Sequence, residues 1–220
     1  EKNLLKQKKL KMKILGIGNA IVDVLCRVDN EFLDKNSLTK STMKLIDEKE
    51  FKNLLKNLTI EETVSGGSVA NNDPSACYPS AILALNATIK TNKREIKADD
   101  FFTGMFETSL DESEMITDIS FIVPQKSSYA KFPNPASRYA MVGVFVAKYD
   151  EGARVAVTGA SQNGVFRSKQ IEDVLSDDFS AKALDGIKIS SDDMLSDIHA
   201  KGDYRAHLIV EMAKRAVNTV

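Results

Sequence analysis

The chain has 220 residues, enough for one large domain or two small ones, and its 43% hydrophobic and 28% charged residues are ordinary for a soluble globular protein. Its net charge of −1 gives the whole chain no attraction to nucleic acid or to anionic lipid. Two cysteines without CxxC spacing and two histidines exclude a disulfide framework and a legible zinc or iron–sulfur site. No apolar run is long enough to span a bilayer, so we expect a reduced, cytoplasmic protein without a bound metal.

The first segment begins with the lysine-rich residues 1–11, which no signal-peptide apolar region follows. Met12 is interpreted as a natural start, with residues 1–11 read through from upstream; the alternative is a solvated leading helix. The elements expected next are a buried strand at 14–18, an extended run at 21–28, a helix at 29–36, a strand at 42–46 and a helix at 47–58.

The start of this segment contains two closely spaced glycines. Gly16-Ile17-Gly18-Asn19-Ala20-Ile21 approaches the GxGxxG loop of dinucleotide sites, but the third glycine is missing. The string Gly16–Val24, followed by Ser65–Asn71, resembles instead the N-terminus of ribokinase-like (PfkB) sugar and nucleoside kinases, the adenosine kinase type especially. That resemblance implies that Asn19 and Asp23 face a sugar, whose hydroxyls amide and carboxylate groups can fix.

The kinase resemblance lacks its catalytic element. In that family a downstream Gly-Ala-Gly-Asp string supplies a base and an anion hole, and the nearest string here, Gly159-Ala160-Ser161, has no aspartate. Phosphoryl transfer needs a base and phosphate clamps together, so the sequence predicts no kinase activity.

The second segment alternates helices and strands without a regular βαβ order, which favours an α+β fold. Its expected elements are a helix at 79–85, a hairpin of 87–91 and 94–97, a helix capped by Asp99 and running to Phe106, a strand at 119–123, a hairpin of 142–149 and 153–158, a helix after Ser168 and a helix at 204–217.

Separated strings in this segment resemble the FAD-binding medium subunit of carbon monoxide dehydrogenase and xanthine dehydrogenase type molybdenum hydroxylases. The strings are Gly66–Pro79, Thr91–Ile96 with Asp100–Gly104, Glu114–Pro124, Tyr129–Phe132 with Tyr139–Val144, and Asp197–Ala200 with Tyr204–His207. The resemblance implies a partial PCMH-type FAD-binding domain at 66–124 and a C-terminal domain at 125–220 with a three-stranded sheet and helices. Residues 1–65 would be an α/β ribokinase-like fragment.

The same resemblance implies the cofactor and its ligands. A Gly-Gly-x-x-Ala loop lies against FAD in that family, because glycine lets backbone N–H groups approach phosphates. By motif position the cofactor-binding residues are Gly66, Gly67, Ser68, Asn71, Asn72, Asp73, Ile116 and Lys131, and no side chain is assigned a catalytic role. The implied partners are an iron–sulfur small subunit and a molybdopterin large subunit, with electrons passing from the clusters through FAD to an acceptor.

The chain departs from that family in three places. The first Gly-rich loop of the family, Ala-Gly-Gly-x-Ser, is missing, Val64 stands where Thr or Ser is usual, and Cys77 stands where Asp is frequent. One loop cannot enclose a pyrophosphate alone, so we expect impaired FAD binding and an inactive isolated chain. The two resemblances meet at Gly66–Asn71, which predicts a chimera; the alternatives are a kinase remnant and a recombination product without a selected function.

Overall fold

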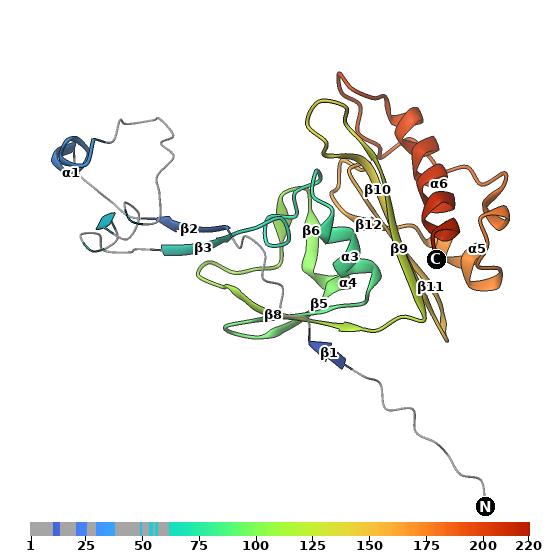
Figure 1. Cartoon of the computed structure of the whole chain (residues 1–220), viewed down its shortest axis with the longest axis horizontal. Coiled ribbons are helices and arrows are strands. Elements are labelled where there is room, and N and C mark those ends of the chain that lie inside the picture. Colours follow the sequence, from blue (N-terminus) through green and yellow to red (C-terminus); the bar gives the residue numbers. More distant parts are fainter. Residues whose placement is uncertain are drawn as a thin grey trace, which may run out of the picture.

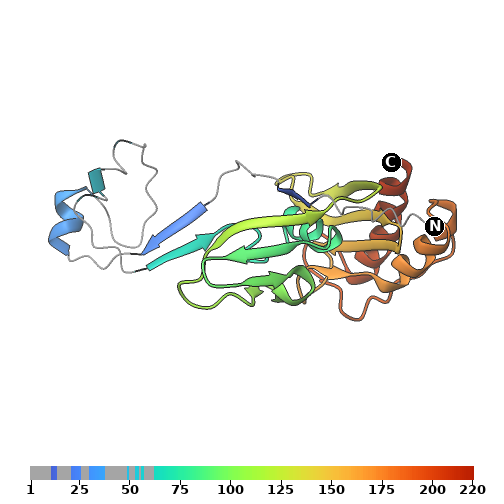
Figure 2. The same ribbon diagram turned by 90° about the horizontal axis from the view of Figure 1, so that it is seen from below.

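Figure 1 shows the computed structural model of the chain, which describes residues 11–13, 21–25, 30–37, 49, 53, 54, 56 and 62–220. Before the main body come strand β1 (Lys11–Lys13), strand β2 (Ile21–Leu25) and helix α1 (Asn30–Lys35). Strand β2 pairs antiparallel with β3 (Glu62–Gly66), and this pair extends away from the main body (Figures 1 and 2). The chain enters the main body at the glycine pair that ends β3.

The first layer of the main body is a four-stranded antiparallel sheet in the order β1-β8-β4-β5. Its later strands are β4 (Thr88–Thr91), β5 (Glu95–Lys97) and β8 (Ile116–Ile122). Helix α3 (Tyr78–Ala84) precedes it, and helix α4 (Ala98–Phe101) leads into a small hairpin of β6 (Phe102–Gly104) and β7 (Glu107–Thr108). Alternation of buried and exposed residues along β4 places Ile89 in a core with Phe101, both fully buried.

The second layer is a four-stranded antiparallel sheet in the order β12-β11-β10-β9. Its strands are β9 (Lys126–Pro133), β10 (Ala140–Tyr149), β11 (Gly152–Thr158) and the short edge strand β12 (Phe166–Arg167). Tyr149 pairs with Gly152, so two residues make the turn, and the φ of +136° at Gly152 suits a residue without Cβ.

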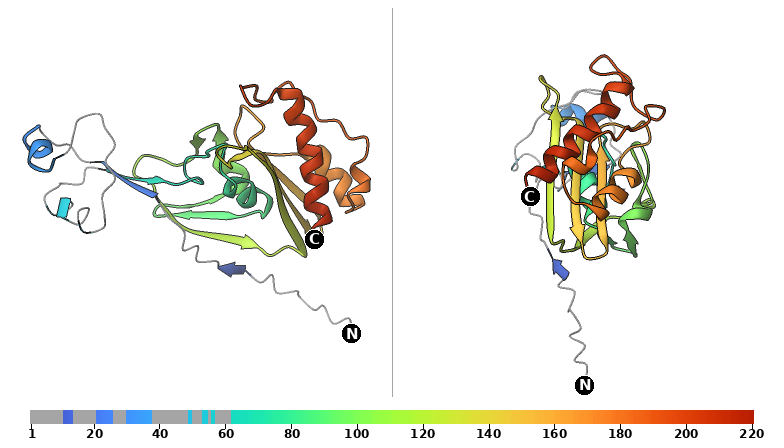
Figure 3. Two further views of the ribbon diagram at one scale, coloured as in Figure 1. Left: turned by 45° about the horizontal axis from the view of Figure 1, so that its top comes forward. Right: turned by 90° about the vertical axis from the view of Figure 1, so that its right-hand side faces the viewer.

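Both faces of this second sheet are covered. Helix α5 (Lys169–Asp177), the 3₁₀ turn η1 (Lys182–Leu184) and helix α6 (Gly202–Asn218) pack on one face, as Figure 3 shows for the helices. Val155 and Val157 of β11 face that side, while Ala156 between them packs with helix α3 on the other. Because both faces of the sheet are covered, β10 and β11 are almost continuously apolar. Helix α3 packs against both layers and so connects them.

Several expected elements are confirmed. The mixed helix and sheet class, α1, α3, the β4–β5 and β10–β11 hairpins, α5 and α6 occur within a few residues of their expected positions. Ser168 is the N-cap residue of α5, although its side chain makes no capping hydrogen bond. The strands expected at 14–18 and 42–46 and most of the helix expected at 47–58 lie outside the described residues.

Two expectations are wrong. The helix from Asp99 to Phe106 ends at Phe101, because the next residues form β6; Lys97 is its N-cap residue, and the Asp99 carboxylate pairs with arginines instead. The C-terminal sheet has four strands rather than three, because the short strand β12 pairs with β11. Within the described ranges, no helix has the length and apolar character needed to cross a membrane.

Candidate cofactor site

The glycine pair opens a compact loop between β3 and α3. The Asn71 N–H donates to the Gly67 carbonyl (2.9 Å), the Asn72 N–H to Val69 (3.3 Å) and the Asp73 N–H to Ser68 (3.4 Å). The donors of these hydrogen bonds all lie in the last part of the loop. The N–H groups of Ser68, Val69 and Ala70 find no acceptor among the described residues, although all three residues are half-buried. Successive N–H groups of this kind form a concavity that suits an anion.

Gly67 gives this concavity an open side. A Cβ placed on Gly67 would have no heavy atom within 4 Å. A side chain there would therefore occupy free space beside the loop rather than clash with the protein. Free N–H groups next to an unobstructed backbone are of a kind that can bind an anion such as a phosphate group.

The other predicted ligands of the loop differ in how far their side chains are buried. Asn71 is exposed, whereas Asn72 is fully buried, and its Nδ2 donates to the carbonyls of Gly104 (2.6 Å) and Glu107 (3.4 Å). The Asp73 carboxylate accepts the Ser75 N–H (2.8 Å), closing a local turn. Gly66 is the last residue of β3.

The end of the loop is fastened to the second sheet. The Thr158 Oγ1 lies 3.0 Å from both the Pro74 and the Ala76 carbonyl oxygens, and it can donate to either. This contact spans more than 80 residues of sequence, and Thr158 is fully buried at the end of β11. The loop is therefore held from both layers of the molecule.

Lys131 lies beside the start of α3. Its Nζ donates to the Arg138 carbonyl (3.2 Å) and contacts the Cys77 Sγ at 3.6 Å. The Tyr129 hydroxyl is buried on the same sheet face, where burial, with a smaller effect of the Cys77 thiol, raises the pKa of this phenol well above its usual value. Lys131, which is exposed, is thus brought to the end of the glycine loop.

Ile116 occupies a different environment. It begins β8 opposite Thr91 and packs against the core that contains Ile89 and Phe101. Its assignment as a flavin-lining residue stays a prediction, as do those of the loop residues and Lys131. Of the kinase-like pair, Asp23 lies in β2 opposite Val64, and Asn19 lies outside the described residues.

Three residues from the motif strings form a lock that sequence reasoning missed. Glu114 is buried and accepts hydrogen bonds from Thr91 Oγ1 (2.6 Å) and from Arg94 Nε and Nη2 (both 3.0 Å). Hydrogen bonding from Arg94 lowers the pKa of Glu114 to about 2, outweighing the burial that opposes ionisation. These hydrogen bonds hold the segment between α4 and β8 against the β4–β5 hairpin. Thr91, Arg94 and Glu114 therefore have a structural role in the fold.

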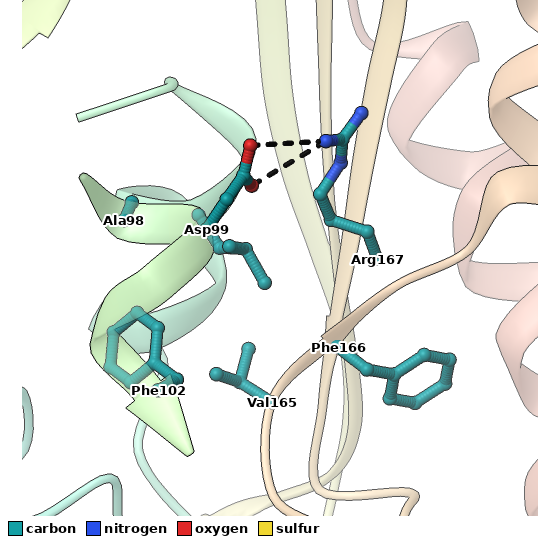
Figure 4. Close-up of a pocket in the computed structure, with 7 residues that line it drawn as sticks. Ala98, Asp99, Phe102, Val165, Phe166 and Arg167 are labelled. Carbon is teal, nitrogen blue, oxygen red and sulfur yellow. Dashed lines mark hydrogen bonds and ion pairs between the residues drawn. The ribbon is translucent and has the colours of Figure 1, made fainter. Parts of the chain in front are cut away.

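A pocket of about 370 Å³ lies between α4 and β12, and none of its lining residues belongs to the glycine loop (Figure 4). Asp99 and Arg167 face each other across it, 3.3 Å apart, and Asp99 also pairs with Arg154 at 2.6 Å. Burial opposes the ionisation of Asp99, but the two guanidinium groups outweigh it and lower its pKa. Because these charges satisfy one another, we interpret the pocket as part of the contact between the layers.

The glycine loop lies in a part of the chain that is similar to known proteins. Residues 61–126 match the model of the FAD binding domain in molybdopterin dehydrogenase. The chain is 30% identical over 167 residues to the nicotine 6-hydroxylase medium subunit of Paenarthrobacter nicotinovorans, and 32% identical over 146 residues to the glyceraldehyde dehydrogenase medium chain of Sulfolobus acidocaldarius. These matches cover 69% and 62% of this chain and 58% and 48% of the two relatives, so the chain spans about half the length of each.

Solved structures show the same fold. CO dehydrogenase from Oligotropha carboxidovorans aligns with a TM-score of 0.58 at 24% identity, over 70% of this chain and 59% of that one. Quinoline 2-oxidoreductase from Pseudomonas putida 86 aligns with a TM-score of 0.57 at 22% identity, with the same coverage. The C-terminal portion of the chain therefore resembles the FAD-binding medium subunits of molybdenum hydroxylases, and FAD is the cofactor that this resemblance implies.

Proposed function

We propose that this chain works as the FAD-binding medium subunit of a molybdenum hydroxylase, and that the loop at 66–73 holds the FAD pyrophosphate. The observation that carries the proposal is the row of N–H groups at Ser68, Val69 and Ala70, free within the described chain and beside the open backbone of Gly67. Hydrogen bonds from N–H groups to a charged phosphate are stronger than neutral ones, so this row suits that anion.

The chain's own contribution is binding and orientation. The loop would hold the phosphates, while Lys131 is an exposed cation fixed next to the loop's end, where it could face an electron-rich edge of a bound ring. FAD supplies the redox chemistry when bound, so no nucleophile or general base is required from the protein. The partners in this proposal are an iron–sulfur subunit that delivers electrons and a molybdopterin subunit that oxidises the substrate.

We also propose that binding by this chain is weakened. The family's first glycine-rich loop is missing, and a single loop covers only part of a dinucleotide. The expected result is saturable binding of FAD in the micromolar range or weaker, rather than the tight retention of a cofactor through purification.

Titration of the purified chain with FAD, followed by quenching of flavin fluorescence, tests the proposal. Gly67→Ala and Gly67→Val should weaken binding progressively, by about tenfold or more for valine, because each places atoms in the open space of the loop. Their thermal unfolding should match the parent's, since a Cβ at Gly67 contacts nothing. A folded parent without saturable binding would refute the proposed function, and equal affinity of the valine variant would refute the assigned loop.

A further inference from the structure

Asn72 is the one predicted ligand of the loop whose side chain is completely enclosed. It is 0% exposed and has a φ of +44°, in the left-handed region that asparagine adopts more readily than most residues. Its side chain is therefore enclosed by the protein, whereas Ser68, Val69 and Ala70, whose N–H groups find no acceptor among the described residues, are half-buried.

The Asn72 side chain forms hydrogen bonds with the β6–β7 hairpin. Both amide hydrogens of Asn72 have acceptors there, the Gly104 carbonyl at 2.6 Å and the Glu107 carbonyl at 3.4 Å. The backbone adds two contacts in the same direction: the Phe106 N–H donates to the Asn72 carbonyl (3.4 Å), and Thr108 Oγ1 donates to the Ala70 carbonyl (3.0 Å). Four hydrogen bonds thus fasten the loop to one hairpin.

The enclosure around Asn72 is specific for an amide. Gly164 lies against it with a φ of +85°, and a Cβ on Gly164 would come within 2.7 Å of Asn72 Nδ2. Asn72 Oδ1 is buried without a hydrogen-bond partner in the described part of the chain, so both hydrogen bonds of this side chain come from Nδ2. A carboxylate in the same place would direct oxygen toward two carbonyl oxygens and would lose this anchoring.

We infer that Asn72 is a positioning residue of the cofactor loop. It fixes the loop on the β6–β7 hairpin, so that the backbone from Ser68 to Ala70 keeps the conformation in which its N–H groups have no acceptor among the described residues. This inference rests on the proposed function for the role of the loop, whereas the fastening consists of hydrogen bonds within the chain itself. Loops held in their binding conformation bind more tightly because less order is lost on binding.

Hydrogen exchange of the FAD-free chain tests the fastening. The amides of Asn71, Asp73 and Phe106 donate hydrogen bonds in or next to the loop, so their exchange reports its order. Asn72→Asp should speed their exchange by about tenfold or more and weaken FAD binding by a similar factor, while the amides of β10 and β11 keep their protection. Asn163→Asp, the same change at a nearby exposed position, should alter neither.

A second variant at Asn72 separates loss of the amide from general unfolding of the chain. If Asn72→Asp loses protection in β10 and β11 as well, Asn72→Ala removes the amide without adding a charge and should still speed exchange of the loop alone. Unchanged exchange at Asn71, Asp73 and Phe106 in the folded variants would overturn the inference. A parent chain that fails to bind FAD would overturn the proposed function, and the exchange data would still decide the role of Asn72.

Discussion

Arg205 offers a sharp test of how the second layer is held together. Its side chain is 4% exposed at the start of α6, where Nη1 donates to the carbonyls of Met141 (2.7 Å) and Gly159 (2.8 Å). Its Nη2 pairs with the Asp197 carboxylate at 2.7 Å. Arg205 therefore joins the first turn of α6 to the start of β10, to the end of β11 and to the preceding loop.

Replacing Arg205 by methionine keeps much of the volume but removes every donor. Two buried carbonyls would lose their partners at about 1–3 kcal/mol each, and breaking a buried ion pair costs about 3–5 kcal/mol in comparable cases. Asp197 is 44% exposed and keeps the N–H groups of His199 and Ala200, so its own contribution is smaller. We expect a net loss of about 3–5 kcal/mol from the free energy of unfolding.

Urea unfolding followed by circular dichroism measures this loss as a shift of the midpoint at an unchanged slope. Arg215→Met is the matched control, because Arg215 lies exposed on the same helix. The control should change the free energy of unfolding by no more than about 0.5 kcal/mol. A loss below about 1 kcal/mol for Arg205→Met, or one equal to the control, would show that these hydrogen bonds do not hold the layer.

Three further predictions concern stability. Hydrogen bonding from Arg94 lowers the pKa of Glu114 to about 2 in the folded chain, below the ordinary 4.5. The stability that Glu114 contributes should therefore be lost as the pH falls from about 4.5 to about 2. Unfolding by urea across this range should show a shallower pH dependence for Glu114→Gln, and identical slopes would contradict the lock. Gly159→Ala should lower the thermal midpoint by several degrees, because φ is +80° there and a Cβ would lie 2.5 Å from the Ala140 carbonyl; an unchanged midpoint would exclude this strain. Phe101→Ala should cost about 3–5 kcal/mol in urea, because the ring is fully buried, and a cost below about 1 kcal/mol would place Phe101 outside the core.

Elements with strong local signals were predictable from the sequence. The apolar runs of β10 and β11 flank a turn that ends in Gly152, and α6 carries its buried residues at helical spacing. Strand β9 was not predicted, because its edge position leaves Lys126, Ser127 and Lys131 exposed and weakens the apolar alternation. The sequence predicts too long a helix at Asp99, because Phe101 and Phe102 suit a helix and a strand equally well.

Some features of the candidate site can likewise be predicted from the sequence and others cannot. The sequence predicts a ligand loop at the glycine pair, because adjacent glycines leave the backbone accessible, and this assignment stays a prediction. The burial of the Asn72 side chain could not be predicted, since asparagine serves equally as a ligand or as a fastener. Thr158 could not be found at all, because its acceptors lie more than 80 residues away and only the packing of α3 on β11 brings them together.

The most direct test of the account is the backbone amide spectrum of the ¹⁵N-labelled chain during titration with FAD. We predict that the largest saturable shifts occur at Ser68, Val69 and Ala70, whose N–H groups have no acceptor among the described residues. Small shifts are expected at Asp99 and Arg167, which line the separate pocket. Shifts centred on that pocket, or no saturable shifts in a folded chain, would contradict the assignment of the glycine loop as the FAD site.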